Sequence, residues 1–416
     1  MVVEQMVNNV KARTTCRLCE SLRIRRVLEL APMPIGDSYV PKQMEHIKQQ
    51  EYPLEVYLCR NCDNVQLGHV IDPKIVYGNY IYRTADSLGL VEHFRKYAAS
   101  VLNTHNIPEQ SLIVEIGSND GSLLKAFKEK KMRVVGIDPA KKIAEEATKA
   151  GIKTIPELFD EHIAENVKKE YGTASIVIAN NVIANIDDLH TMIKGIKKLL
   201  ADDGVFICET GYVKDLIEKT ILDNIYHEHI SYFAAKPLKT FFGQFGLRLQ
   251  NVEHVQTKGG SIRCTVVQSN SNMQPTENVQ RMIQEEQHDH QQFLLFDEHI
   301  KQIKDNLMRF FDNSKEKSVA GYGASVGVTT MLYNFGIDKQ IHFLVDDNPN
   351  RQGLLSPGKH IPVKSKQALL DENVDYCVIF AWQYNEPIVA KNKAFLENGG
   401  KFVTILPEFG LYRPNE

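Results

Sequence analysis

The chain has 416 residues, of which 43% are hydrophobic and 24% charged, a composition that fits a folded protein of two or three domains. Its 49 Lys and Arg against 52 Asp and Glu give a net charge of −3, so no global basic field exists to hold nucleic acid or an anionic membrane. No apolar run approaches the roughly 20 residues of a membrane-spanning helix, and the first residues lack a signal-peptide layout. We therefore expect a cytoplasmic protein without nucleic-acid or membrane partners.

Four of the seven cysteines form two Cys-x-x-Cys pairs, Cys16 with Cys19 and Cys59 with Cys62. Four thiolates in two knuckles are the ligand set of a tetrahedral Zn²⁺ ion, and they leave no open position for catalysis. The sequence therefore predicts a structural zinc site in an N-terminal lobe over residues 1–85. The alternative is thiol redox chemistry, which normally places one such motif at the start of a helix.

Strand and helix patterns alternate over residues 86–275. An apolar stripe of helical spacing follows residue 90, and SLIVEIG and RVVGIDP are two apolar runs of strand length that flank a turn and a helix. Further units follow in TASIVIANNVI and VFICETG, and LRLQNVEHV and SIRCTVVQS resemble closing strands. This alternation predicts a central Rossmann-like parallel sheet with helices on both faces.

Residues 276–312 contain almost no Gly or Pro and carry apolar side chains three and four apart, which predicts a long connecting helix. After it, residues 318–347 repeat the order of residues 113–138: strand, glycine turn, helix, and a strand that ends in Asp. We therefore expect a second Rossmann-like domain over residues 313–416. The predicted fold class is α/β, with a small Cys₄ lobe, a central sheet, a connecting helix and this C-terminal domain.

The first glycine turn, VEIGSNDGSLL, is the candidate cofactor site. Its Gly-x-x-x-Gly spacing, with an acidic residue two before the first Gly, suits S-adenosylmethionine (SAM) better than a dinucleotide, since SAM has no pyrophosphate to hold. An acidic residue at the end of the next strand can accept hydrogen bonds from ribose hydroxyls. The alternative for the turn is an ordinary tight turn. The expected cofactor residues here are Glu115, Gly117, Asn119, Asp120, Gly121 and Asp138.

Two asparagines, Asn180 and Asn181, follow a central strand at the carboxyl edge of the sheet. Ligands bind at this edge in open α/β sheets, so both residues join the expected cofactor site. The alternative is that they cap the strand end without touching a ligand.

The segment DNIYHEHISYF concentrates ionisable side chains and is the strongest catalytic signal of the chain. If it is extended, His227 and His229 share one face, as metal ligands would, and Tyr226 and Glu228 share the other. The second possibility is acid–base catalysis, because a histidine with a pKa near 6.5 can remove a proton at neutral pH and a tyrosine hydroxyl can stabilise an oxyanion. A purely structural loop is the third.

Taken in order, the two CxxC pairs, EIGSNDGSLL, ANNVIAN, YHEHISYF, KGGSIR and GYGAS resemble the SAM-dependent sugar C-methyltransferases. The resemblance covers nearly the whole chain. It implies a zinc lobe, a SAM-binding domain and a C-terminal domain that helps to hold the substrate. It also implies methylation, at C3, of a nucleotide-linked 4-keto-6-deoxysugar, and we expect a monomer.

Several site residues follow from this resemblance. It implies that His229 is the base, with Tyr226, Glu228 and a tyrosine of YGNYIY, Tyr80, beside the sugar. Asn185 of NVIAN and Lys258 of KGGSIR stand where relatives have histidines, and an amide cannot titrate. The expected substrate-binding residues are Lys258, Ser261 and Arg263 of KGGSIR. Tyr322 and Ser325 of the second glycine turn join them, because this turn opens a predicted helix whose free N–H groups suit the pyrophosphate of a nucleotide sugar. For the second glycine turn, a purely structural role stays open.

Two other activities remain as alternatives. A sugar O-methyltransferase would use the same cofactor without an enolate, and an NAD-dependent nucleotide-sugar epimerase or dehydrogenase would use the second glycine turn for its cofactor. A zinc-stapled scaffold without activity would leave the YHEH block unexplained.

Overall fold

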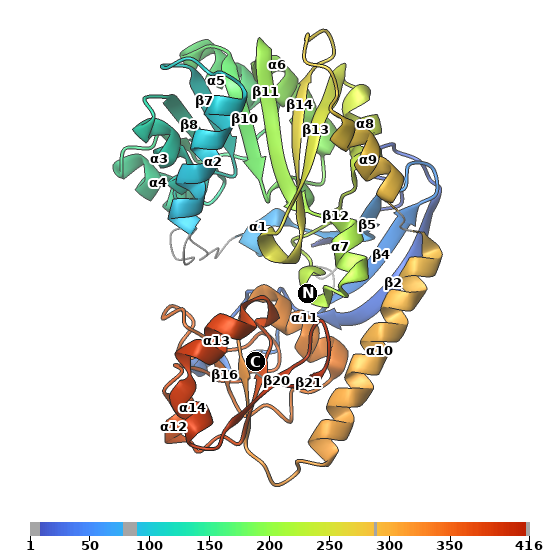
Figure 1. Cartoon of the computed structure of the whole chain (residues 1–416), viewed down its shortest axis with the longest axis vertical. Coiled ribbons are helices and arrows are strands. Elements are labelled where there is room, and N and C mark those ends of the chain that lie inside the picture. The colour runs from blue at the N-terminus through green and yellow to red at the C-terminus, as the bar shows by residue number, and fades with distance from the viewer. Residues whose placement is uncertain (1–8, 78–89, 287–288, 413–416) are drawn as a thin grey trace, which may run out of the picture.

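The computed structural model describes residues 9–77, 90–286 and 289–412. It confirms the α/β class. In Figure 1 the central sheet and its helices lie above the C-terminal α/β unit, and the strands of the N-terminal lobe and helix α10 (His290–Asp312) connect the two. Among these residues, none of the helices has both the length and the apolar character that crossing a bilayer requires.

The N-terminal lobe is built around a four-stranded sheet in the order β12-β5-β4-β2. Its outer strand β12 (Ser231–Tyr232) belongs to the histidine-rich segment, and it pairs antiparallel with β5 through Ser231–Gln66 and Tyr232–Val65. The lobe and the histidine-rich segment therefore share one sheet. The lobe's own elements are β1 (Val10–Ala12), β2 (Ile24–Met33), β3 (Val40–Pro41), η1 (Lys42–Met44), β4 (Tyr52–Cys59), β5 (Val65–Leu67), β6 (His69–Ile71) and α1 (Pro73–Tyr77).

The central sheet has seven strands in the order β13-β14-β11-β10-β7-β8-β9. The strands from β11 to β9 are parallel, and β14 and β13, the expected closing strands, pair antiparallel at one edge of the sheet. Its strands are β7 (Leu112–Ile116), β8 (Arg133–Ile137), β9 (Thr154–Ile155), β10 (Ala174–Asn180), β11 (Leu200–Gly211), β13 (Leu247–Val255) and β14 (Ser261–Gln268). The helices are α2 (Leu90–Thr104), α3 (Ser122–Glu129), α4 (Lys141–Lys149), α5 (Glu161–Tyr171), α6 (Leu189–Leu199), α7 (Val213–Glu218) and α8 (Ala235–Gly243), with η3 (Ile183–Asn185), η4 (Leu222–Asn224) and η5 (Thr257–Gly259).

The helix expected over residues 276–312 is two helices, α9 (Glu277–Glu285) and α10. Glu286 leaves the helical conformation, and its carboxylate accepts hydrogen bonds from the Ala235 N–H and, at 3.0 Å, the Lys236 N–H at the start of α8. The first N–H groups of a helix have no partner within the helix, so a carboxylate there is stabilising. Helix α10 then buries Phe293, Phe296, Ile300, Ile303, Leu307 and Phe311.

The C-terminal unit has a six-stranded sheet in the order β18-β16-β15-β19-β20-β21, parallel except at β21. Its strands are β15 (Val319–Tyr322), β16 (Leu344–Val345), β18 (Val363–Lys364), β19 (Tyr376–Ile379), β20 (Lys401–Thr404) and β21 (Gly410–Leu411), while β17 (Leu354–Leu355) pairs with β3. The helices are α11 (Val326–Phe335), α12 (Ala368–Asp371), α13 (Asn385–Lys391) and α14 (Lys393–Glu397), with η6 (Trp382–Tyr384).

The predicted repeat between the two Rossmann-like units extends to individual hydrogen bonds. In the first turn the Asp138 carboxylate accepts from the Asn119 N–H at 2.8 Å and the Ala140 N–H at 2.9 Å. In the second turn the Asp346 carboxylate accepts from the Ala324 N–H at 2.7 Å and the Asn348 N–H at 2.8 Å. The strand-end Asp therefore ties the glycine turn to the next loop in both units.

Helix α11 connects the C-terminal unit to the histidine-rich segment. The Thr330 hydroxyl donates to the Ile225 carbonyl at 2.9 Å, and the Trp382 indole N–H donates to the Asp223 carboxylate at 3.0 Å. A side chain at Gly327 would meet the Asp223 carbonyl oxygen at 2.2 Å, so the close approach of α11 requires glycine there. All three units thus meet around residues 223–232.

Candidate functional site

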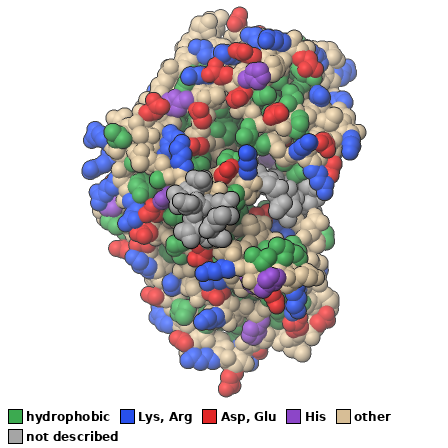
Figure 2. Space-filling model, turned by 180° about the vertical axis from the view of Figure 1, so that it is seen from behind, with side chains coloured by type: hydrophobic (Ala, Val, Ile, Leu, Met, Phe, Trp, Pro, Cys, Tyr) green, Lys and Arg blue, Asp and Glu red, His purple; other side chains and the backbone are tan. Residues whose placement is uncertain are grey.

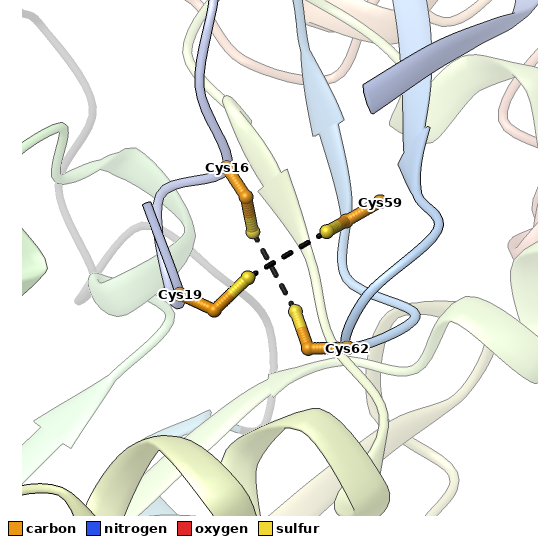
Figure 3. A group of neighbouring side chains, drawn as sticks. All are labelled: Cys16, Cys19, Cys59 and Cys62. Carbon is orange, nitrogen blue, oxygen red and sulfur yellow. Dashed lines mark hydrogen bonds between the residues drawn. The ribbon is translucent and has the colours of Figure 1, made fainter. Parts of the chain in front are cut away.

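The four predicted zinc ligands lie together, as Figure 3 shows. Cys16 Sγ is 3.6 Å from Cys62 Sγ, Cys19 Sγ is 3.6 Å from Cys59 Sγ, and all four sulfur atoms lie within 4.8 Å of one another. Sulfur atoms at about 2.3 Å from a tetrahedral centre are about 3.8 Å apart, so the arrangement fits Zn²⁺. Neither CxxC motif begins a helix, which removes the structural support for the redox alternative.

The first glycine turn adopts the left-handed backbone that its sequence requires. Gly117, Asn119 and Gly121 have φ values of 71°, 48° and 75°. The Asp120 side chain accepts from the backbone N–H and the hydroxyl of Ser122, so it also stabilises the turn at the start of α3.

Glu115, at the end of β7, is the buried acid of this site. It is 5% exposed, and its Oε2 atom has no hydrogen-bond partner among the described residues. Burial, with a smaller contribution from Asp138 and Asp120, raises the pKa of Glu115 well above its usual value. A buried carboxyl group with an unused oxygen fits a cationic or N–H-bearing ligand such as the amino group of SAM.

An open pocket of about 630 Å³ lies beside Asp138, where β8 and β9 end. Its lining includes Pro139, Pro156, Leu158 and His162, and Leu158 is 60% exposed. An exposed large apolar side chain next to a polar strand end offers a surface for a flat ring. No motif in the sequence marks these residues as a binding site. The signal that could have found them is the end of a strand directly before Pro156.

Asn180 and Asn181 lie at the same edge of the sheet. The Asn180 Oδ1 atom accepts from the Tyr97 hydroxyl at 3.5 Å, and Asn181 has a φ of 57°. The Asn181 N–H donates to the Glu209 carbonyl at 2.7 Å, and Asn181 is one of the residues that line a small cavity.

Arg263, an expected substrate-binding residue, is held by a carboxylate that the sequence reasoning missed. Its Nε and Nη2 atoms donate to Glu209 Oε2 at 3.0 and 2.7 Å, and its guanidinium lies 4.3 Å from the centre of the Tyr97 ring. The Thr257 hydroxyl completes the cluster by donating to Glu209 Oε1. The arginine charge is therefore neutralised by Glu209 rather than presented alone to a phosphate.

The histidine-rich segment forms a turn instead of the extended strand considered above. We call residues 226–229 the histidine turn; the His229 N–H donates to the Tyr226 carbonyl at 3.0 Å and closes it. As a result, Tyr226 and His229 lie on the same side, with ring centres 4.1 Å apart. The turn also contains Glu228, which is buried.

His229 is held on both ring nitrogens. Its Nδ1 atom lies 3.1 Å from the Asn224 carbonyl oxygen, which can only accept, so Nδ1 carries the proton of the neutral ring. The other nitrogen, Nε2, therefore has the lone pair, and the Tyr226 hydroxyl donates to it at 2.8 Å. This is the arrangement of an oriented base with a phenol beside it.

His227 points away from His229 and into the N-terminal lobe. Its Nε2 atom lies 3.3 Å from the carbonyl oxygens of both Tyr52 and Pro53, and burial lowers its pKa to about 4. The shared face that a metal site would need does not form, so the interpretation of His227 and His229 as paired ligands is wrong.

His229 lines the small cavity at the carboxyl edge of the central sheet. The Ser231 hydroxyl is buried there without a hydrogen-bond partner among the described residues. A buried hydroxyl in this state is available to a ligand oxygen or a water molecule. The other lining residues are Asn181, Ala184, Thr210, Gly211, Asn224 and Tyr232.

The remaining expected site residues fall into three groups. Asn185 lies in η3, where its Oδ1 atom is buried with no partner in the described part of the chain. Tyr80 and the side chain of Lys258 lie outside the described residues. Ser261 is fully buried, and its hydroxyl donates to the Thr257 carbonyl at 3.0 Å, which leaves no surface for a substrate.

The second glycine turn differs from its prediction in part. Tyr322 is 3% exposed and donates its hydroxyl to Asp347 at 2.9 Å, so it packs inside the C-terminal unit instead of facing a substrate. Ser325 is exposed at the start of α11. The nearby Gly327 is covered by Asp223, which restricts access to the first turn of the helix.

Comparison with known proteins gives three family models that match consecutive parts of the chain. A "Putative zinc binding domain" matches residues 16–77, a "Methyltransferase domain" residues 90–252, and a "C-methyltransferase C-terminal domain" residues 256–407. The curated C-methyltransferase NovU of Streptomyces niveus is 31% identical over 412 residues, which cover 97% of this chain and 98% of NovU.

Solved structures resemble part of the chain. One is magnesium protoporphyrin IX methyltransferase (ChlM) from Synechocystis PCC 6803 with bound SAH, at 17% identity and a TM-score of 0.35, covering 47% of this chain and 92% of that one. Another is the PH0226 protein from Pyrococcus horikoshii OT3, at 14% identity and a TM-score of 0.37, covering 46% and 97%. From the match to NovU along nearly its whole length, together with the three family models, we conclude that this chain belongs to the SAM-dependent C-methyltransferase family.

Proposed function

We propose that this protein transfers the methyl group of SAM to C3 of a nucleotide-linked 4-keto-6-deoxysugar, through an enolate of the sugar. The observation that carries the proposal is the oriented His229, with its Nε2 lone pair beside Tyr226 and next to a cavity at the ligand-binding edge of the sheet. The full-length similarity to a C-methyltransferase supports carbon as the methyl acceptor. Carbon becomes nucleophilic when an adjacent ketone can hold the charge of a carbanion.

The chain's residues suit SAM at this edge. The buried Glu115 carboxylate would pair with the cofactor's amino group, Asp138 would lie at its ribose, and the pocket around Leu158 would receive its adenine. Bound SAM supplies an electrophilic methyl group. The remaining residues proposed to line its site are Gly117, Asn119, Asp120, Gly121, Asn180 and Asn181.

In the proposed mechanism, His229 Nε2 takes the proton from C3. The electron pair of the broken C–H bond passes toward the ketone oxygen and forms an enolate. Tyr226 turns its hydroxyl from Nε2 to that oxygen and stabilises the charge. When C3 takes the methyl group, the C–S bond of the sulfonium would break with its electron pair left on sulfur, the enolate returns to the ketone, and His229 passes its proton to solvent. Glu228 and Asn185 hold the sugar's hydroxyl groups in place, and the site keeps the reacting atoms aligned.

The other parts of the chain have supporting roles in this proposal. The Cys₄ cluster holds a structural zinc ion, and Tyr80, Lys258 and Ser325 contact the nucleotide sugar. On the face shown in Figure 2, basic and acidic side chains are interspersed. A small charged substrate therefore requires local contacts rather than a broad field. We propose a cytoplasmic monomer.

The test is product analysis with a thymidine-diphosphate-linked 4-keto-6-deoxyhexose and SAM. We expect a new methyl group bonded to carbon in the wild type and none with His229→Asn, while the variant keeps SAM affinity within about twofold, since His229 acts on the substrate. A methyl group on oxygen would establish the O-methyltransferase alternative. Calorimetric binding of NAD in place of SAM would establish the epimerase or dehydrogenase alternative.

A further inference from the structure

Arginine occupies the same place in both zinc knuckles, directly after the first cysteine, but the two side chains have different surroundings. Arg60 of the second knuckle is exposed, whereas Arg17 of the first is 0% exposed. Burial of a guanidinium is costly unless its N–H groups find partners. The contacts that hold Arg17 therefore matter for the fold around it.

Arg17 reaches three segments at once. Its Nη1 atom donates to the carbonyl oxygens of Leu67 and Ile230, both at 2.9 Å, and its Nε atom donates to Asp187 Oδ1 at 3.0 Å. Its own backbone N–H donates to the Gln66 side chain at 2.8 Å. The knuckle, strand β5, the loop after β10 and the start of β12 are thus joined at one side chain.

Two of these contacts lie next to proposed catalytic residues. Ile230 directly follows His229, and its N–H donates to the Ala184 carbonyl at 2.8 Å. Asp187 lies two residues after Asn185, which follows Ala184. Arg17 therefore holds two segments next to the cavity: the one that contains His229 and Ile230, and the one that runs from Ala184 to Asp187.

We propose that Arg17 is a positioning residue: it links the zinc knuckle to the segment that follows His229 and so keeps the His229 ring in place. The proposal rests on the proposed function for its kinetic consequence, but not for its effect on the His229 ring. Loss of the guanidinium frees the Ile230 carbonyl from the knuckle, so the histidine turn can shift. A misplacement of about 1 Å can cost about 100-fold in rate.

The experiment compares Arg17→Met with Arg60→Met, the matched change in the other knuckle. Zinc content, SAM affinity and kcat and KM are measured together with the ¹⁵N NMR spectrum of histidine-labelled protein, in which His229→Asn identifies the His229 signals. We expect Arg17→Met to retain one zinc and its SAM affinity, to change KM by less than about threefold and to lose about 100-fold in kcat. We also expect His229 to lose its single Nδ1–H tautomer, and Arg60→Met to match the wild type throughout.

A zinc-loaded Arg17→Met protein with wild-type His229 signals would overturn the proposal. Loss of the single Nδ1–H tautomer in Arg60→Met as well as in Arg17→Met would also overturn it. If Arg17→Met fails to fold, Arg17→Lys decides, because lysine keeps the charge but cannot reach three partners with a planar fork. Wild-type His229 signals in that variant would also refute the role. If the wild type transfers no methyl group to the sugar, the proposed function fails, and the spectrum still decides the role of Arg17.

Discussion

His227 gives the clearest physical prediction outside the reaction itself. Replacing it with glutamine removes a buried imidazole but keeps an N–H group that can donate to the carbonyls of Tyr52 and Pro53, the two acceptors of the His227 ring. Since the pKa of His227 in the folded chain is about 4, against an ordinary 6.5, the unfolded chain takes up this proton first as the pH falls. The contribution of the neutral His227 ring to the free energy of unfolding is therefore present above pH 6.5 and is lost between pH 6.5 and pH 4.

The size of the effect follows from these two pKa values. One pKa unit corresponds to about 1.4 kcal/mol, so the full loss approaches about 3 kcal/mol, of which about 2 kcal/mol falls between pH 7 and pH 5. Carboxyl groups also titrate in this range, so the informative quantity is the difference between the wild type and His227→Gln, in which their contributions cancel.

The assay is urea unfolding at pH 7 and pH 5, followed by circular dichroism. We expect the free energy of unfolding of the wild type to fall by about 2 kcal/mol more than that of His227→Gln over this interval. His162→Gln is the control, because it removes an exposed histidine of α5. An equal fall in the wild type and in His227→Gln would refute the reasoning.

Two further predictions concern the cofactor and the metal. The raised pKa of Glu115 makes its charged form unfavourable in the folded state, so the stability of the wild type should fall as the pH rises above about 4.5. At pH 8, Glu115→Gln should therefore melt at a higher temperature than the wild type. By calorimetry the same variant should bind SAM about 10 to 100 times more weakly. A variant that is both less stable and unchanged in SAM affinity would contradict this. Cys59→Ser should bind less than one zinc per chain by elemental analysis and melt at a lower temperature, whereas Cys377→Ser, in the C-terminal sheet, should keep its zinc; full zinc occupancy in Cys59→Ser would exclude the Cys₄ site.

Local patterns predicted much of this molecule. The glycine turn before α3, the strand-end Asp138 and the two CxxC knuckles each depend on residues close in sequence, so their signals are readable without the fold. The repeat of the turn at Asp346 was readable for the same reason. Even here, the sequence did not reveal that Asp138 first serves to tie two backbone loops together.

Contacts between distant segments could not be predicted. Strand β12 joins the sheet of the N-terminal lobe, Glu209 neutralises Arg263, and Arg17 is buried while Arg60 is not, and no local pattern distinguishes these outcomes. The alternating residue types of the histidine turn favour an extended backbone, the condition under which His227 and His229 would share a face. The hydrogen bond from the His229 N–H to the Tyr226 carbonyl closes a turn instead. Tertiary packing decided the pairing of β12, the contact of Glu209 with Arg263 and the burial of Arg17, whereas a local hydrogen bond closes the histidine turn.

The most direct test of the account follows the proton that His229 is proposed to remove. In D₂O, with the nucleotide-linked keto sugar and S-adenosylhomocysteine in place of the methyl donor, the wild type should replace the hydrogen at C3 with deuterium, as read by NMR. His229→Asn should show no exchange above the uncatalysed rate, because asparagine cannot accept the proton. Equal exchange by the two proteins would contradict the assignment of His229 as the base.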